Sequence, residues 1–332
     1  MSAATAPSAA AGRRTLAVLV LIPVVAALAL AVFAWPAARI APRDLPIGVA
    51  GPAVAADAVE WQLGRHEGAF EIHRYEDAGA ARAAIEDRDV YGAVVVTPRG
   101  TELLTASAGS PVVAGLLREA VAAQAPAGTP VPVTDVVAAP AGDPRGAVLG
   151  ASLLPLALVG AATGVATALL GLRGARAVAT LVGAAALAGL VGAALADSWL
   201  GALTGDWWAE AGVLGLTVLA IGSSFAGLAT LLGKSGFGLG AALTILLGNA
   251  FSGMSSAPEL LPTGVGALGQ WLPPGAGGSA LRSVSAFDGA AAGGPLLVLS
   301  LWAVAGLTAT AFGARRRVEA APSTEPAPVP AG

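Results

Sequence analysis

The sequence has no cysteine, one lysine and two histidines in 332 residues. The lack of cysteine excludes disulfides, thiolate metal sites and cysteine nucleophiles. Charge is also scarce, because 12% of the residues are charged, whereas soluble domains average about 25%. The formal net charge of −3 predicts no basic surface of the kind that binds nucleic acid. Nucleic acid is therefore not an expected partner.

Apolar residues take the place of the missing charges. They make up 55% of the chain, whose mean hydropathy is +0.74, and this composition is typical of a protein that lies in a lipid bilayer. A helix needs about 20 apolar residues to cross a bilayer. Six segments meet or approach that length: 15–35, 147–171, 177–196, 211–233, 237–254 and 295–314. The sequence therefore predicts an α-helical polytopic membrane protein with six transmembrane helices.

The first of these segments has two interpretations. The basic pair Arg13 and Arg14 precedes it, as in a cleavable signal peptide. Its apolar run ends in Trp35-Pro36, and no small-x-small cleavage site follows directly. We therefore predict that residues 15–35 are a retained transmembrane helix.

Basic residues at the segment ends predict the orientation, because cytoplasmic loops carry an excess of Lys and Arg. If six helices alternate, one side receives Arg13, Arg14, Arg173, Arg176, Lys234 and Arg315 to Arg317. That side is then the cytoplasm, and it also holds the two tails, 1–14 and a disordered 315–332. The opposite side receives the loop 197–210, whose Trp199, Trp207 and Trp208 suit an outer aromatic belt. The abundance of Ala, Gly, Val and Arg indicates a GC-rich bacterial genome, so the expected location is the inner (plasma) membrane.

The sequence predicts no catalytic residues, no cofactor site and no metal site. The predicted helices have no Asp, Glu, Lys, Arg or His in their interiors, which argues against a proton antiporter. His66 and His73 lie on different predicted elements, a pattern more typical of ordinary surface polarity than of a metal site. Residues 227–235, GLATLLGKS, resemble a phosphate loop but have one residue too many between the glycines, since the motif needs four. We expect no enzyme activity, and any ATP would be bound by another chain.

Residues 36–145 are predicted to form an extracytoplasmic α/β domain inserted between the first and second transmembrane helices. Strands are expected at 45–50, around Phe70 and Ile72, at 90–96 (VYGAVVV), at 101–107 (TELLTAS) and at 131–137 (VPVTDVV). Helices are expected after the first strand, with Val54, Ala58 and Trp61 on one stripe, at 78–88, and through Val113, Leu116, Leu117, Ala120 and Val121 at helical spacing. This alternation predicts a small α/β sandwich with largely parallel strands.

The remaining part, 146–314, is predicted to be a five-helix membrane domain with one unusual stretch at 246–262, LLGNAFSGMSSAPELLP. There an apolar helix turns polar at Asn249, roughly 18 Å along its length. The chain from there to Gly294 is too short and too broken to cross a membrane twice, so an outer re-entrant or interfacial segment is predicted at about 255–293. The stretch is either an ordinary helix end with capping chemistry or a functional outer gate or substrate vestibule.

The order GN-x-x-SG, PELLP, LGQWLPPGAGGSALRS and a final apolar helix resembles the permeases of type 2 ATP-binding-cassette exporters, and in particular their phage infection protein-like branch. The residues that carry the resemblance are Gly248, Asn249, Ser252, Gly253, Pro258, Glu259, Leu260, Pro262, Leu272, Pro273, Leu281 and Arg282. In that family an outside domain follows the first span and five spans come after it, an order that this chain matches along nearly its whole length. The resemblance implies a homodimer or heterodimer of permeases, served by a separate ATPase subunit, that exports an amphipathic, lipid-like or drug-like compound.

The expected mechanism is alternating exposure of a dimer cavity, lined by the second and fifth helices and closed on the outside by residues 249–282. The candidate residues of the outer gate or vestibule are Asn249, Ser252, Ser255, Pro258, Glu259, Pro262, Gln270 and Arg282. The candidate contact with the ATPase is the turn at 171–177, through Arg173 and Arg176. A different class is also open, a non-transporting membrane scaffold or receptor whose extracytoplasmic domain binds a partner or a component of the cell envelope.

Overall fold

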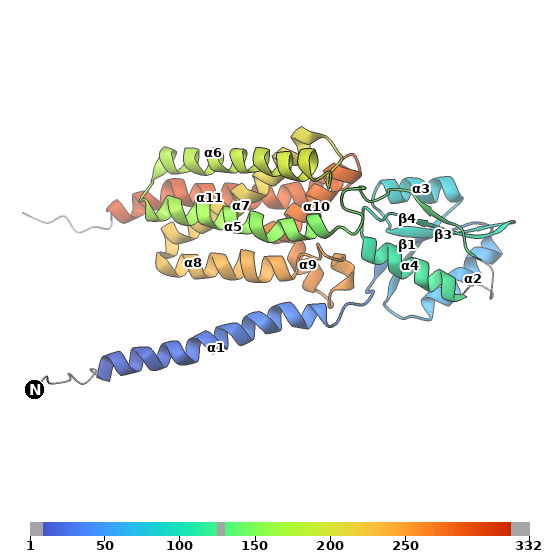
Figure 1. Cartoon of the computed structure of the whole chain (residues 1–332), viewed down its shortest axis with the longest axis horizontal. Helices are drawn as coiled ribbons and strands as arrows, with labels where there is room; N and C mark the ends of the chain where they lie inside the picture. The colour runs from blue at the N-terminus through green and yellow to red at the C-terminus, as the bar shows by residue number, and fades with distance from the viewer. Residues whose placement is uncertain (1–8, 125–129, 320–332) are drawn as a thin grey trace, which may run out of the picture.

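Long apolar runs form long helices, and the shorter alternating segments between the first two of them form a sheet. The computed structural model describes residues 9–124 and 130–319. A small sheet domain (residues 38–146) lies at one end of a helical bundle (Figure 1). We call this end of the bundle the sheet-domain end, and the opposite end the far end. The first turn of α1 and the last turn of α11 both lie at the far end (Figure 1).

Five of the helices contain a stretch long and apolar enough to cross a membrane. They are α1 (Ala9–Ala37), α5 (Ala147–Leu169), α6 (Gly174–Ala193) with its π-helical continuation η1 (Ala194–Trp199), α7 (Trp207–Leu232) and α11 (Gly293–Glu319). The predicted helix at 237–254 is instead the shorter apolar helix Lys234–Gly248, formed by α8 (Lys234–Gly240) and the π-helix η2 (Ala241–Gly248). Five helices of spanning length are thus present in the described residues, where the sequence predicted six.

Helix ends differ from the prediction at three places. α7 begins at Trp207, so Trp207 and Trp208 belong to the helix and not to the preceding loop. The helix begins there because Asp206 caps it, accepting a 2.8 Å hydrogen bond from the amide of Ala209. α1 begins at Ala9 and α11 continues to Glu319, so residues 9–14 and 315–319 of the two predicted tails lie within helices. The rest of these tails, 1–8 and 320–332, lies outside the described residues.

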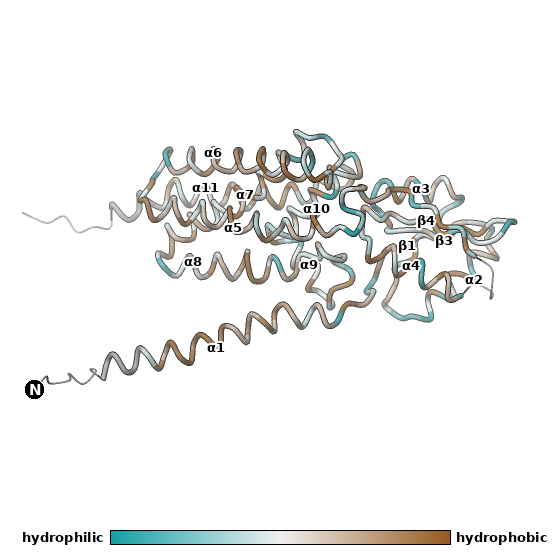
Figure 2. Tube along the Cα trace, viewed as in Figure 1, coloured by the Kyte–Doolittle hydropathy of each residue, from teal (hydrophilic) through white to brown (hydrophobic). Residues whose placement is uncertain are grey.

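Helix α7 is the centre of the bundle. Of its most apolar stretch, 78% is buried, compared with 28% or less for the other long helices. It packs against α5, α6 and α11, and the bundle is apolar along its length (Figure 2). By contrast, none of the most apolar stretch of α1 is buried, and this helix diverges from the bundle towards the far end (Figure 1).

The sheet has five strands in the order β2-β1-β3-β4-β5. They are β1 (Leu45–Ala50), β2 (Phe70–Tyr75), β3 (Gly92–Thr97), β4 (Gly100–Thr105) and β5 (Val133–Asp135). The pairs β1–β2, β1–β3 and β4–β5 are parallel, and the hairpin β3–β4 is antiparallel. The predicted, largely parallel pairing is therefore present in a small mixed sheet.

Helices cover both faces of the sheet. α2 (Ala53–Gly64) and α4 (Pro111–Gln124) pack on one face, and α3 (Ala78–Glu86) packs on the other. The stripe that the sequence singled out on α2 points away from the sheet, because Val54 is 85% exposed and Trp61 is 69% exposed. Ala56 and Leu63, on the opposite side of α2, face the core.

Candidate functional site

The chain between η2 and α11 turns back at the sheet-domain end of the bundle as a series of short helices (Figure 1). We call residues 249–292 the broken segment. It contains the 3₁₀-helix η3 (Pro258–Leu260), α9 (Val265–Gln270) and α10 (Pro273–Ala286). The helices are therefore interrupted at the place where the sequence predicted a re-entrant or interfacial segment.

Proline and glycine shape this segment. Prolines occupy the first turn of η3 and of α10, where a missing amide hydrogen costs nothing because it would have no partner in the helix. Gly269 in α9 lies so close to the backbone of Phe251 that a Cβ atom there would collide with the Phe251 carbonyl oxygen. Its lack of a side chain allows α9 to pack directly on the chain that leaves η2.

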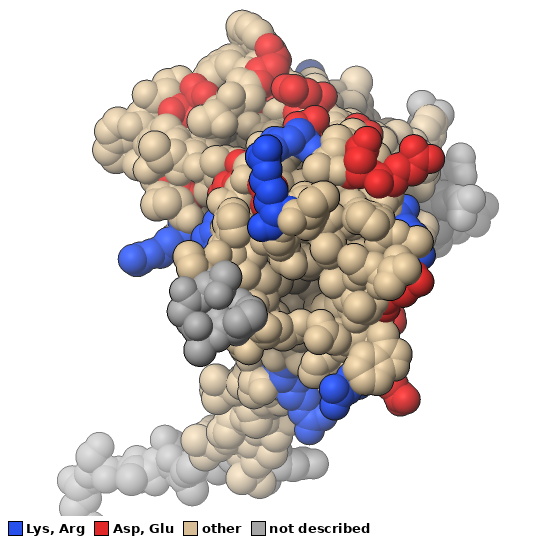
Figure 3. Space-filling view, turned by 90° about the vertical axis from the view of Figure 1, so that its right-hand side faces the viewer, with Lys and Arg blue, Asp and Glu red and all other residues tan. Residues whose placement is uncertain are grey.

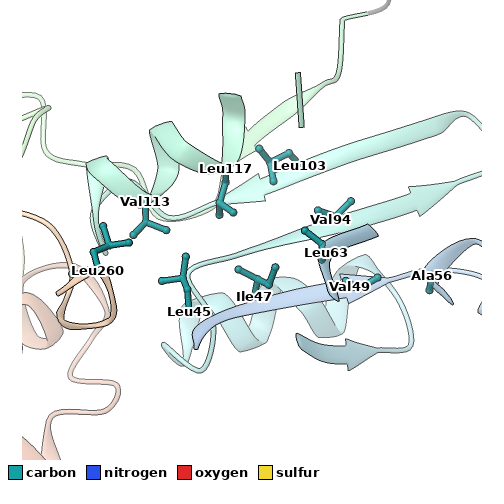
Figure 4. Close-up of a cluster of buried hydrophobic side chains, with 11 residues drawn as sticks. Leu45, Ile47, Val49, Ala56, Leu63, Val94, Leu103, Val113, Leu117 and Leu260 are labelled. Carbon is teal, nitrogen blue, oxygen red and sulfur yellow. The ribbon is translucent and has the colours of Figure 1, made fainter. Parts of the chain in front are cut away.

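The broken segment also forms part of the sheet-domain core. Ala257 and Leu260 are fully buried in the same cluster as Leu45 and Val113, and Figure 4 shows Leu260 beside these two side chains. Backbone hydrogen bonds join the two parts as well, from Ala41 N to Leu260 O at 3.1 Å and from Arg43 N to Glu259 O at 3.0 Å. The sheet domain is therefore docked on the segment by both apolar and polar contacts.

Four side chains form a polar cluster at this junction: Arg88, Tyr91, Glu259 and Arg282. The Tyr91 hydroxyl donates a 2.8 Å hydrogen bond to Glu259 Oε2. Arg282, which is 3% exposed, donates from Nη2 to the carbonyl oxygen of Met254 at 3.1 Å. Its Nε atom is buried without a hydrogen-bond partner among the described residues.

Arg88 connects the sheet domain to α10. Its Nη1 donates to the carbonyl oxygen of Ser279 at 3.1 Å and also to the hydroxyl of Ser283. Its guanidinium carbon lies 5.2 Å from the centre of the Phe287 ring, within the range of a cation–π contact. Arg88 itself has a positive φ of 66°, an uncommon conformation for a residue other than glycine.

The charges of this cluster are not paired with one another. Within the part of the chain that the structure describes, neither Arg88, Glu259 nor Arg282 has an ion pair within 4.0 Å. Burial lowers the pKa of the Arg88 guanidinium, and it lowers the pKa of Arg282 to about 10. Burial, together with the neighbouring Glu259 carboxylate, raises the pKa of the Tyr91 hydroxyl. At neutral pH both arginines therefore stay protonated and Tyr91 stays a donor, so the cluster carries two positive charges and one negative charge.

A cavity of about 630 Å³ lies beside the polar cluster, between the base of the sheet domain, the broken segment and α11. Its polar wall is formed by Arg43, Asp44, Arg88, Glu259, Gln270 and Ser279. Its apolar wall includes Trp271, Leu297 and Leu301. Leu297 and Leu301 on α11 are 60% and 56% exposed, so the apolar wall continues onto the outer surface of the bundle.

The predicted gate residues are divided between different places. Pro258, Glu259, Pro262 and Gln270 line the cavity of about 630 Å³. A second cavity of about 220 Å³, next to the end of α1, is lined by Asn249, Ser252 and Ser255. Arg282 lines neither of these cavities. The structure thus does not bring the predicted residues together in one vestibule.

Gln270 has a structural part in holding the segment together. Its Nε2 donates to the carbonyl oxygen of Ser252 at 2.9 Å, and its Oε1 accepts from the Ser279 hydroxyl at 2.6 Å. This side chain therefore joins the start of the broken segment, at Ser252, to α9 and α10.

Arg173 and Arg176 lie together at the far end of the bundle. Arg173 is the residue before the first turn of α6, and Arg176 follows in that turn. Both side chains are exposed. They are available for contact with a partner, on the end opposite to the cavity.

Sequence reasoning missed the part of the site that the sheet domain supplies. Arg43, Arg88 and Tyr91 carried no signal, because their partners lie far along the chain, 168 residues away for Tyr91 and Glu259. It also missed Glu210, which is fully buried near the start of α7 and accepts a 2.9 Å hydrogen bond from the amide of Gly205.

The two histidines are not part of this site. His73 Nε2 lies 3.4 Å from Glu71 Oε1 in a contact that is exposed on both sides. No group of three His, Asp or Glu side chains that could hold a metal ion occurs in the described ranges. Seen from the sheet-domain end, acidic and basic side chains are interspersed, and neither sign covers that face (Figure 3).

Comparison with known proteins finds no relative of this chain. No family model, no curated protein and no solved structure matches the chain. Over residues 9–124 and 130–319 the chain is mostly helical, with five helices of membrane-spanning length and a small mixed sheet. Its apolar helices are those of a protein that inserts into a membrane.

Proposed function

We propose that the chain is the membrane permease subunit of a type 2 ATP-binding-cassette exporter, which moves an amphipathic or lipid-like compound out of a bacterial cell. The observation that carries this proposal is the cavity of about 630 Å³ beside the broken segment. Its volume falls within the roughly 300–1,000 Å³ of typical ligand sites. One wall is charged and the other is apolar and open along α11, a division that suits a molecule with a polar head and a hydrocarbon part.

The proposed topology has six crossings. The apolar helices α1, α5, α6, α7, α8 with η2, and α11 alternate in direction between the two ends of the bundle (Figure 1). Arg173, Arg176 and Lys234 lie at the far end, which is then the cytoplasmic side of the inner membrane. The sheet domain and the cavity are placed outside. The short helix Lys234–Gly248 reaches the outer surface with the help of the broken segment, whose irregular backbone is shielded by protein.

In this proposal two permeases pair, and α5 and η2 line the path between them. The broken segment closes the path on the outside. The sheet domain contacts the broken segment through Leu260 and the polar cluster. In this proposal, a movement of the broken segment therefore shifts the sheet domain as well. Energy would come from a separate ATPase at the far end.

Arg173 and Arg176 are the proposed contact with that ATPase. A positive charge at a helix N-terminus is unfavourable, because the helix dipole is positive there. The helix dipole therefore does not explain why two arginines lie at the start of α6. Contact with acidic groups on a partner would explain it. The other reason is orientation in the membrane, which basic residues elsewhere at the same end would still enforce.

The test is charge reversal at this turn. We expect the double variant Arg173→Glu, Arg176→Glu to insert normally but to lose co-purification with a cassette ATPase from native membranes. Lys234→Glu, which reverses a charge at the neighbouring turn, is the matched control and should keep the ATPase. Normal co-purification of the double variant would reject this contact. If the unaltered chain brings down no cassette ATPase, the exporter proposal itself is wrong.

A second candidate is a membrane scaffold or receptor whose outside domain binds a partner. The stripe on α2 favours it, because Val54 and Trp61 are large apolar side chains that are 85% and 69% exposed, and exposed aromatic residues are common at binding interfaces. In that case an envelope component, and no ATPase, should co-purify with the chain. Trp61→Ala should then abolish its capture.

A further inference from the structure

We infer that the cavity of about 630 Å³ binds an amphipath whose headgroup has a net negative charge, with its phosphate or carboxylate held by Arg43 and Arg88 and its hydrocarbon chain along α11. The inference rests on the proposed function for the role of this cavity as a substrate site. It adds the chemical class of the substrate, which the exporter proposal leaves open.

The charges of the polar wall favour an anion. Arg43 and Arg88 line the cavity together with the acids Asp44 and Glu259. Arg282, buried directly behind this wall, adds a further positive charge, so the region has one more positive than negative charge. A buried charge without a partner is costly, and an anionic group next to these arginines would offset that cost.

The guanidinium groups keep donors for such a headgroup. Arg88 uses only Nη1 for its two hydrogen bonds to α10, and its Nε and Nη2 make no hydrogen bond to the residues described. Arg43 donates from Nη1 to the carbonyl oxygens of Ala41 at 3.0 Å and Leu260 at 2.9 Å, and from Nη2 to that of Arg39 at 2.9 Å. These bonds hold the side chain in place and leave Nε and one Nη2 hydrogen for a headgroup. Planar guanidinium groups fixed in this way match the oxygen atoms of phosphate and carboxylate groups.

The apolar wall favours an attached hydrocarbon chain. Leu297 and Leu301 are one turn apart on α11, with Trp271 of the broken segment also lining the cavity. The backbone carbonyl of Trp271 accepts a 2.8 Å hydrogen bond from the Trp302 indole, which fixes this wall to α11. A ligand with its headgroup on Arg88 can therefore lay its chain on the surface of α11 without leaving an apolar environment.

Binding by the full-length purified protein, with its ATPase if one co-purifies, tests this inference. The probes are fluorescent lysophosphatidylglycerol, which is anionic, and fluorescent lysophosphatidylcholine, which is zwitterionic. Unlabelled glycerol 3-phosphate is added as a competitor. We expect the anionic lipid to bind about tenfold more tightly, as a hydrogen bond to a charged group would give, and glycerol 3-phosphate to compete poorly.

Three variants locate the site. Leu301→Trp places a larger side chain in the apolar part of the cavity and should lower the affinity for the anionic lipid by about tenfold. Val304→Trp, on the same helix and 62% exposed but outside the cavity lining, should bind within about twofold of the unaltered chain. Arg88→Gln should remove the preference for the anionic headgroup. Because Arg88 also contacts α10, the variant at Leu301 keeps the inference testable if Arg88→Gln does not fold.

Three results would overturn the inference. Equal affinity for both lipids would show that the cavity does not select an anionic headgroup. Full competition by glycerol 3-phosphate would make the ligand a free phosphate compound. Disulfide cross-linking between two Leu301→Cys chains, in a protein that otherwise lacks cysteine, would show that a second copy covers this wall. Co-purification with an ATPase is independent of all three, so failure of the ligand class and failure of the exporter proposal can be told apart.

Discussion

The sheet domain and the helical bundle both bury large aliphatic residues, but the bundle adds close contacts at small residues. In the sheet domain, large aliphatic residues such as Leu45, Ile47 and Ile85 are at most 1% exposed. In the bundle, Ile221 and Leu299 are fully buried as well, and α7 also meets its neighbours at glycines. A Cβ atom on Gly189 of α6 would collide with the backbone of Ala211, and one on Gly306 of α11 would collide with that of Ser223.

The difference follows from the solvent around each region. In water, burial of a large aliphatic side chain contributes about 1.5–3 kcal/mol, so a domain in water gains stability from leucine and isoleucine. Lipid is as apolar as leucine, so helices there associate through close contact between backbones, which small residues permit. Placement of the sheet domain in water and of the bundle in lipid, as in the proposed topology, would account for these close contacts.

The largest expected effect is the labelling of the two regions from opposite sides. Ala83 on α3 and Ala175 on α6 are both exposed alanines in helices, and the chain has no native cysteine. In intact cells a membrane-impermeant maleimide should label Ala83→Cys and leave Ala175→Cys unlabelled until the membrane is opened. Equal labelling of both variants in intact cells would contradict the proposed topology.

The core of the sheet domain should respond to loss of a large side chain. Ile85→Ala removes a fully buried side chain and should lower the stability of the sheet domain by roughly 2–5 kcal/mol. Hydrogen exchange should rise in the sheet domain and stay unchanged in the bundle. Val54→Ala, at a position 85% exposed, is the control and should change stability by less than about 0.5 kcal/mol. A rise in exchange across both regions would show that they unfold as one unit.

The bundle should respond instead to the addition of a side chain. Gly189→Leu places side-chain atoms against backbone, which cannot move aside as a flexible side chain can, so we expect a loss of about 3 kcal/mol and aggregation on gel filtration. A Cβ atom at Gly183, on the same helix, would meet nothing within 4 Å, so Gly183→Leu is the control. It should purify as the unaltered chain does. Similar behaviour of the two variants would mean that close packing does not stabilise the bundle.

The smallest expected effect concerns the junction between the regions. Tyr91→Phe removes the hydroxyl that donates to Glu259 and should weaken the docking by about 1.5 kcal/mol. The readout is faster hydrogen exchange of η3 and the start of β3, with the cores of both regions unchanged. Tyr75→Phe, whose ring packs against the α3 side of the sheet, is the control. If hydrogen exchange at η3 is unchanged in Tyr91→Phe, the polar cluster does not contribute to the docking of the two regions.

Much of the fold follows from local patterns that the sequence displays. Apolar runs locate α1, α5, α6, α7 and α11, because spanning length is a property of consecutive residues. The break after η2 is equally local, since Pro258 and Pro273 lie in the first turns of new helices, where proline is favoured. The helical spacing of Val113, Leu116 and Leu117 likewise predicts α4.

Local patterns fail where two apolar faces compete. On α2, Val54 and Trp61 form the more apolar stripe, yet the smaller Ala56 lies against the sheet. The predicted helix at 237–254 shows a related limit, because this apolar run includes residues after Gly248 that belong to the broken segment.

The sequence by itself thus determined which segments are apolar helices, where they break and which part of the chain forms the sheet. Only the tertiary structure decided that Tyr91 donates to Glu259 and Arg88 to α10, and that Asn249 and Glu259 line different cavities. The physical reason is range. Helix length, proline breaks and periodicity depend on neighbours along the chain, whereas a charged side chain from the sheet domain reaches the broken segment only after the two regions have docked.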